Sequence, residues 1–221
     1  MSSESHTGFF ISFEGSEGCG KSTQIGLLMN ALQEAGQPPL LVREPGGTPL
    51  GEQIRHLLKH APEGKDMTPE AELLLFAASR AQLAREVIQP ALAEGRIVIS
   101  DRFLDSTTVY QGVARRIPGE SVDLINQFAA GSRLPDVTFL LDMDPVAAME
   151  RARRRNEVID RLEQEPLEFF HAVRNGYLAL AERHPDRICV IDASQAPSSV
   201  STSIRQELQR RCHGLFSSSS I

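Results

Sequence analysis

Short apolar runs alternate with longer amphipathic stretches along most of this chain. Each run is rich in branched or aromatic residues and is bounded by turn or charged residues, which is typical of strands buried in a parallel sheet. The sequence therefore predicts strands at residues 8–13, 40–42, 97–100, 137–141 and 188–191.

The stretches between these runs have the spacing of helices. Gly36 and Gly95 stand where helix C-caps would fall, and Pro145 and Pro166 suit first-turn positions. Strands that alternate with helices of this length imply right-handed βαβ units, and hence an α/β fold with a doubly wound, five-stranded parallel sheet. Ligands of such sheets bind at the carboxyl ends of the strands. The predicted helices span residues 21–35, 50–60, 69–94, 121–130, 145–155, 166–182 and 198–212.

Length and composition fit one soluble α/β domain. The 221 residues show no repeat and no long linker, and residues 1–8 and 213–221 are predicted to be polar tails. The net charge of -6 argues against a generic nucleic-acid binder, and no apolar run is long enough to span a membrane. Three cysteines without CxxC spacing favour neither a disulfide framework nor a zinc site, and fit the cytoplasm.

The first predicted strand is followed by GSEGCGKS, which matches the phosphate-loop pattern G-x-x-x-x-G-K-[ST]. Its glycines let the backbone N–H groups curl towards phosphate oxygens, and the helix that follows offers its positive end. Lys21 is predicted to reach the β and γ phosphates of ATP, and the Ser22 hydroxyl to ligate Mg²⁺. The candidate nucleotide-binding residues are Gly15, Ser16, Glu17, Gly18, Cys19, Gly20, Lys21, Ser22 and Thr23.

A second metal-binding group is expected beside the phosphate loop. Asp101 ends the third predicted strand, in RIVISD, which places it at the carboxyl edge of the sheet next to the first strand. A lone Asp after a strand often caps a helix or turn, but with a phosphate loop in the same chain we favour a Walker-B role on Mg²⁺.

The group that accepts the phosphate is suggested by arginines. A phosphate monoester needs no catalytic base, because its second pKa lies near 6, but two anions must be brought together. Arg43 and Arg102 follow predicted strands, and Arg80 lies in a helix. A further arginine cluster falls within residues 151–161, for which spacing alone leaves a mobile lid and a solvated helix face equally open.

Several motifs together make the chain resemble the bacterial thymidylate kinases from about Phe9 to Arg210. These motifs are FEGSEGCGKST, REPGGT, LLFAASRAQL, DRF followed by DSTTVYQG, LPDVTFLLD and DRLEQEPLEFF. The resemblance implies transfer of the terminal phosphate of Mg-ATP to thymidine monophosphate, in the synthesis of thymidine triphosphate. It also implies a P-loop kinase fold with a short lid, and a homodimer.

The resemblance also assigns roles by position. By this resemblance Phe76 would stack on thymine and Arg80 would bind its O4 edge. The two lie four apart, so one helical face presents both, and a plain core position is the alternative for Phe76. Glu17 would meet the 3′-hydroxyl, and Tyr110 could exclude a ribose 2′-hydroxyl. Arg43 and Arg102 would clamp the acceptor phosphate, Thr107 and Gln111 would lie near the base, and Arg153 and Arg155 of the lid would cover the transferring group.

Two other classes of function stay open on the sequence. Another P-loop kinase, acting on a different nucleotide or a metabolite hydroxyl, would lack the REPGG, FAASR and YQG set. An ATP-binding switch module would release no ADP in response to an acceptor.

Overall fold

The computed structural model describes residues 8–131, 133–154 and 160–212. Its strands form one parallel sheet in the order β2-β3-β1-β4-β5. The central strand β1 lies between β3 and β4, so the chain winds outward in both directions from it. The strands are β1 (Phe10–Glu14), β2 (Leu40–Arg43), β3 (Val98–Asp101), β4 (Val137–Asp142) and β5 (Ile188–Asp192).

Helices follow each strand, and three of the described helices begin at a side-chain cap. Thr48 and Thr68 cap α2 and α3 through their side chains, each before a proline, and Asp144 does so for α7. The helical elements are α1 (Lys21–Glu34), α2 (Pro49–Lys59), η1 (Pro62–Gly64), α3 (Pro69–Leu83), η2 (Ala84–Ile88), α4 (Gln89–Ala93), α5 (Leu104–Thr107), η3 (Thr108–Ala114), α6 (Gly119–Ala130), α7 (Pro145–Arg153), α8 (Leu167–Arg183) and α9 (Pro197–Arg211).

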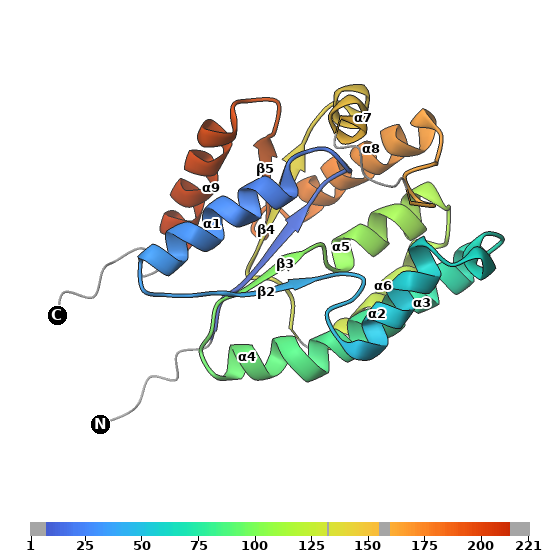
Figure 1. Cartoon of the computed structure of the whole chain (residues 1–221), viewed down its shortest axis with the longest axis horizontal. Coiled ribbons are helices and arrows are strands. Elements are labelled where there is room, and N and C mark those ends of the chain that lie inside the picture. The colour runs from blue at the N-terminus through green and yellow to red at the C-terminus, as the bar shows by residue number, and fades with distance from the viewer. Residues whose placement is uncertain (1–7, 132, 155–159, 213–221) are drawn as a thin grey trace.

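The helices cover both faces of the sheet, as a doubly wound fold requires (Figure 1). On one face α1 and α9 pack side by side, and their apolar side chains join those of β1, β3, β4 and β5 in the largest core cluster. On the other face α8 and η3 form a second cluster, and α3, η2 and α4 a third. Within the described chain, no helix is long and apolar enough to cross a membrane.

All five predicted strands are present, and each predicted helix has a counterpart, although the one predicted at residues 145–155 ends at Arg153 and Arg155 lies outside the described residues. The short helical turn η1 was not predicted, and two larger differences occur. The helix predicted at residues 69–94 is interrupted by the π-helical turn η2. Residues 104–114, for which no helix was predicted, form α5 and the π-helix η3. Both differences involve i→i+5 backbone pairing, which has no simple sequence signature and often marks functional sites.

A buried ion pair joins the start of α5 to the residue that precedes β5, Arg187. Both Asp105 carboxylate oxygens accept from the Arg187 guanidinium, at 2.6 and 2.8 Å. The Thr138 hydroxyl on β4 also contacts Asp105, at 3.3 Å. The pair therefore fixes α5 against β4 and against the segment that leads into β5.

Replacing Asp105 by Asn should destabilise the fold strongly. Because Asp105 is 1% exposed, the change leaves the Arg187 charge in the interior without its partner. We expect the free energy of unfolding, measured by urea denaturation, to fall by about 3–5 kcal/mol. The control is Arg210→Gln, which removes an exposed pair with Glu207 and should leave the midpoint unchanged. A D105N protein as stable as the parent would show that this pair does not support the fold.

Candidate active site

The phosphate loop between β1 and α1 has the backbone that its glycines allow. Gly15, Gly18 and Gly20 all have positive φ angles, of 134°, 79° and 98°. A Cβ on Gly18 would lie 2.0 Å from the carbonyl oxygen of Ala148, so α7 packs directly on this loop. Any side chain at this position would push α7 away from the loop.

Lys21 stands at the start of α1 with its ammonium turned back into the loop. Its Nζ donates to the carbonyls of Gly15 and Ser16, at 3.0 and 2.9 Å. No side chain caps α1 among the described residues, and its first turn carries no acidic residue. The free N–H groups and the positive end of the helix therefore face a cavity of about 300 Å³ that Gly20, Lys21 and Ser22 line. These features together make a site for an anion such as phosphate.

Asp101 and Ser22 lie on the walls of this same cavity. Asp101 pairs in register with Phe13 of β1, at the carboxyl end of the sheet, as predicted. One of its carboxylate oxygens is buried and has no hydrogen-bond partner within the described chain. A hydroxyl and a carboxylate with a spare oxygen fit Mg²⁺, which prefers oxygen ligands and retains several waters.

A buried carboxylate that the sequence did not single out organises the segment after β3. Glu14 ends β1 and is fully buried. It accepts from the Phe103 N–H at 2.8 Å, the Ser106 hydroxyl at 2.6 Å and the Tyr177 hydroxyl at 2.7 Å. Burial, followed by the nearby Asp105 charge, raises the pKa of Glu14 above its ordinary value.

Arg102 is held above the phosphate loop by this segment. It has a φ of 70°, a left-handed conformation that costs a non-glycine residue roughly 1–2 kcal/mol. Its guanidinium donates to Glu17 at 2.8 Å and to Ser106 at 3.1 Å, and lies 5.3 Å from the centre of the Tyr110 ring. Burial on its own would raise the pKa of Glu17, but the charges of Lys21 and then Arg102 outweigh it and lower that pKa. Glu17 is thus a carboxylate at neutral pH.

A second, narrower cavity opens beside the first and is more apolar. Phe76 of α3 is only partly buried and lines this cavity, so it is not a plain core residue. Tyr110 and Gln111 of η3 also line it, and their contact with an acceptor stays a prediction. The Tyr110 hydroxyl is buried without a partner in the part of the chain that the structure describes.

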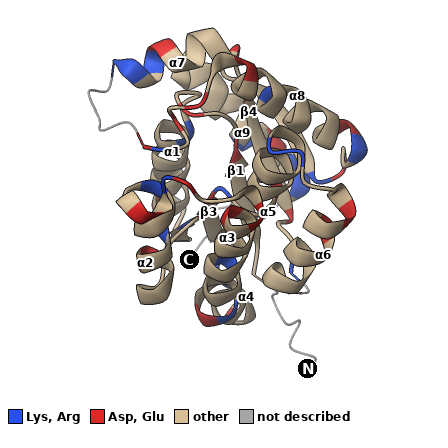
Figure 2. Cartoon of the chain, turned by 90° about the vertical axis from the view of Figure 1, so that its right-hand side faces the viewer, with Lys and Arg blue, Asp and Glu red and all other residues tan. Residues whose placement is uncertain are grey.

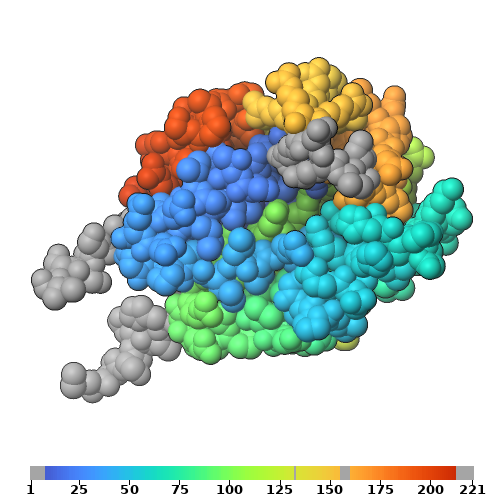
Figure 3. Space-filling view, viewed as in Figure 1, coloured from blue at the N-terminus to red at the C-terminus, as the bar shows by residue number. Residues whose placement is uncertain are grey.

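The two cavities meet along a common wall. The residues that line both are Glu17, Glu44, Lys59, Arg102, Asp160 and Glu163. Basic and acidic positions both occur on the segments around this end of the sheet (Figure 2). In the space-filling view the dark blue atoms near the end of β1 lie recessed between the yellow atoms of α7 and the lighter blue atoms of α1 (Figure 3).

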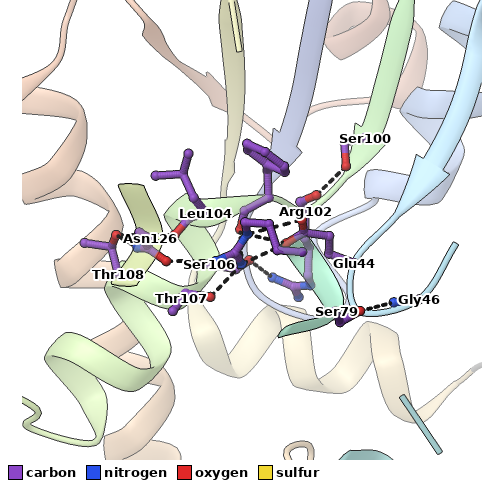
Figure 4. Close-up of polar contacts among 12 residues, drawn as sticks. Glu44, Gly46, Ser79, Ser100, Arg102, Leu104, Ser106, Thr107, Thr108 and Asn126 are labelled. Atoms are coloured by element: carbon purple, nitrogen blue, oxygen red, sulfur yellow. Dashed lines mark hydrogen bonds and ion pairs between the residues drawn. The ribbon is translucent and has the colours of Figure 1, made fainter. Parts of the chain in front are cut away.

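Arg80, which was expected to bind the O4 edge of thymine, does not line the apolar cavity in the described structure. It is 1% exposed, and within the described residues it lines neither cavity. Its guanidinium donates to Glu44 at 2.9 Å, Thr107 at 2.7 Å and Asn126 at 2.8 Å. Figure 4 shows these three partners converging from separate elements. In this structure Arg80, which also binds Thr107, therefore fixes Glu44, a residue that lines both cavities. A contact of Arg80 with a base stays a prediction.

Glu72 of α3 is a second buried carboxylate, and it supports the other end of the apolar cavity. It accepts from Gln111 at 2.8 Å, Arg115 at 3.2 Å and Arg161 at 2.5 Å. Burial on its own would raise the pKa of Glu72, but the hydrogen bonds from Gln111 and Arg161, together with the charge and hydrogen bond of Arg115, lower it. No pattern in the sequence distinguishes Glu72 from the other acidic positions of α3.

The remaining predicted arginines divide into three groups. Arg43 lines the phosphate cavity but is exposed and paired with Glu52 at 2.9 Å. Arg153 ends α7 at an exposed position, and Arg155 lies outside the described residues. Arg151 was predicted only as a member of the arginine cluster within residues 151–161. It donates to the Ala193 carbonyl at 3.1 Å.

Arg151 also lines a third cavity, of about 330 Å³, on the other side of the phosphate loop. Gly18 and Gly20 border both this cavity and the phosphate cavity. Its remaining walls come from α1, from the segment between β5 and α9, and from the start of α9. The residues that line it are Gly18, Cys19, Gly20, Thr23, Gln24, Arg151, Ala193, Gln195, Pro197 and Val200.

Comparisons with known proteins show which family this chain resembles. The family model for thymidylate kinase matches residues 13–204. The thymidylate kinase of Chlorobium chlorochromatii is 47% identical over 211 residues, which cover 91% of this chain and 94% of that protein. That of Syntrophotalea carbinolica is 49% identical over 191 residues, covering 84% and 88%.

A solved structure agrees as well. The crystal structure of thymidylate kinase from Ehrlichia chaffeensis matches with a TM-score of 0.76 at 33% identity, covering 91% of this chain and 99% of that one. On the family model, the related sequences and this structure, the chain belongs to the thymidylate kinase family.

Proposed function

We propose that this chain transfers the γ-phosphoryl group of ATP to thymidine monophosphate. The observation that carries the proposal is the common wall of the phosphate cavity and the apolar cavity, which includes Glu17 and Arg102. A donor phosphate at Lys21 and an acceptor phosphate at Arg102 would meet across this wall. Membership of the thymidylate kinase family supports the choice of acceptor.

ATP would lie across the phosphate loop. Its phosphates would occupy the cavity at the start of α1, and its base the third cavity beside Arg151. Ser22 and Asp101 would hold Mg²⁺, which supplies neutralisation of the charge on the β and γ phosphates. Gly15, Ser16, Cys19 and Thr23 complete the proposed loop contacts.

Thymidine monophosphate would bind in the apolar cavity. The Phe76 ring would stack on the base, Tyr110 would lie against the sugar, and Arg102 would hold the phosphate by charge-assisted hydrogen bonds. Arg43 would join Arg102 after releasing Glu52. Arg80 could reach O4 of the base by giving up one of its buried partners, and it already fixes Glu44 and Thr107 around the cavity.

The lid is proposed to span residues 151–161, with Arg153 and Arg155 over the transferring group. Its closure would exclude water, so that the acceptor oxygen attacks instead of a water molecule. The reaction needs no general base, because thymidine monophosphate already carries a nucleophilic phosphate oxygen. The three free thiols fit our further proposal that the enzyme works in the cytoplasm.

We also propose that the chain forms a homodimer through α6 and α3. Leu124 and Phe128, one helical turn apart on α6, are 68% and 79% exposed. Leu74 on the neighbouring α3 is exposed as well. Large exposed apolar side chains grouped in this way are typical of an interface.

The first test is release of ADP from Mg-ATP with a panel of nucleoside monophosphates. We expect release to depend on thymidine monophosphate and to stop when EDTA removes the metal. Deoxyuridine monophosphate lacks one methyl group, a loss of about 1–3 kcal/mol, and should react more slowly. Deoxycytidine monophosphate should react more slowly still, because an amine replaces O4. A different preferred nucleotide would contradict the proposed base pocket, and no stimulation at all would contradict kinase activity.

Arg102→Ala should lower kcat/KM for thymidine monophosphate by at least ~10²-fold, since it removes the charged donor from the wall shared by both cavities. Steady-state kinetics and a thermal melt would be measured together, to separate catalysis from folding. The matched control is Arg183→Ala, an exposed arginine of α8. Turnover of R102A within threefold of the parent would exclude the proposed role.

Phe128→Glu should convert the protein to a monomer, because it places a charge in the proposed apolar contact. Sedimentation equilibrium would measure the mass. Leu27→Glu, a change at an exposed position of α1, serves as the control. A monomeric parent protein, or a dimer that survives F128E, would argue against this interface.

A further inference from the structure

One residue that lines the third cavity, Gln24, carries a buried polar atom without a hydrogen-bond partner in the described chain. Gln24 lies in the first turn of α1 and is 3% exposed. Its amide nitrogen donates to the Pro197 carbonyl at 3.0 Å. Its amide oxygen is buried and, among the described residues, has no hydrogen-bond partner.

The orientation of this amide is fixed by chemistry. The Pro197 carbonyl can only accept a hydrogen bond, so the nitrogen of Gln24 must face it and the oxygen must point elsewhere. Buried polar groups in folded proteins are nearly always paired. The Gln24 oxygen is such an unpaired acceptor, on a residue that lines the cavity, and a ligand bound there can supply the missing donor.

The walls around Gln24 are tied down from two sides. Arg151 of α7 donates to the carbonyls of Ala193 and Ser194, at 3.1 and 3.5 Å, while Gln24 holds Pro197 four residues after Ala193. The segment between β5 and α9 is thus anchored to α7 and to α1. A flat base entering this cavity would meet a preformed slot with Gln24 on its wall.

We propose that the side-chain oxygen of Gln24 accepts a hydrogen bond from the exocyclic amine of adenine, and thereby selects ATP over GTP. The inference rests on the proposed function, which places the base of the phosphate donor in this cavity. That amine is the one N–H donor that the adenine ring offers once it is joined to ribose. Guanine carries a carbonyl oxygen at the same ring position, and two acceptors that face each other in a buried site weaken binding.

The test compares ATP with purine riboside triphosphate, which lacks the amine, and with GTP. Dissociation constants from calorimetry and kcat/KM with thymidine monophosphate are measured on the full chain. The parent protein should prefer ATP to purine riboside triphosphate by about 3- to 10-fold, as one neutral hydrogen bond predicts. GTP should bind more weakly than either. Equal dissociation constants for ATP and purine riboside triphosphate would overturn the proposal without any variant.

Variants then locate the contact. Gln24→Leu and Gln24→Met keep the length of the side chain and remove its acceptor. Both should reduce the preference for ATP over purine riboside triphosphate to about onefold. If Gln24 only anchored Pro197, both nucleotides would weaken together and the ratio would persist, which would overturn the proposal. The matched control is Gln195→Leu, an exposed glutamine of the same cavity, which should keep the parent ratio.

Two further arms separate the remaining explanations. If the oxygen of Gln24 instead accepts from the ribose, 2′-deoxy-ATP will bind more weakly than ATP in the parent and equally in Q24L, which would contradict the adenine contact. Failure of the proposed function appears separately, as the absence of thymidine monophosphate-dependent ADP release with every nucleotide. In that case the dissociation constants for ATP and purine riboside triphosphate still test the role of Gln24.

Discussion

The geometry of the site depends on the hydrogen bonds that the buried Glu14 side chain accepts. Glu14 ends the central strand, where β1 meets the phosphate loop, and it accepts from the segment after β3 and from Tyr177 of α8. Three parts of the chain are therefore held at one buried point. Arg102 can keep its left-handed backbone because the residues that follow it are fixed to Glu14.

An acidic chain can bind two anionic nucleotides because its charges are arranged locally. Lys21, Arg102 and Lys59 surround Glu17, and all three lower its pKa. Lys59 also pairs with Asp160 at 2.7 Å, on the wall that the two cavities share. The carboxylates at this wall thus hold the cations in place before phosphate arrives, which reduces the reorganisation that binding requires.

The sequence predicted those parts of the structure that depend on local rules. The strand positions followed from short apolar runs, and the phosphate loop from glycines at fixed spacing, because both patterns act over a few residues. Asp101 was placed correctly next to β1 because neighbouring parallel strands end at the same edge. The residues chosen for the acceptor cavity came from family resemblance, and Phe76, Tyr110 and Gln111 do lie together.

What the sequence missed depends on distant partners. The segment of α5 and η3 lacks regular apolar spacing and is held by Glu14 and Glu72, far from it in the chain. The position of Arg80 follows from Glu44 and Asn126, which are 36 and 46 residues away. One usable signal existed, since Glu14 is the charged residue of a mostly apolar strand, and such a residue needs buried partners.

The common wall of the phosphate and apolar cavities has a thermodynamic consequence. Six residues belong to both, so occupation of either cavity changes the electric field and the side-chain freedom in the other. Heterotropic coupling of this kind is reciprocal: whatever factor the donor nucleotide imparts to the affinity for the acceptor, the acceptor imparts to the donor. Any preferred order of addition is then a matter of access and rates, since the ternary complex has one free energy whichever nucleotide enters first.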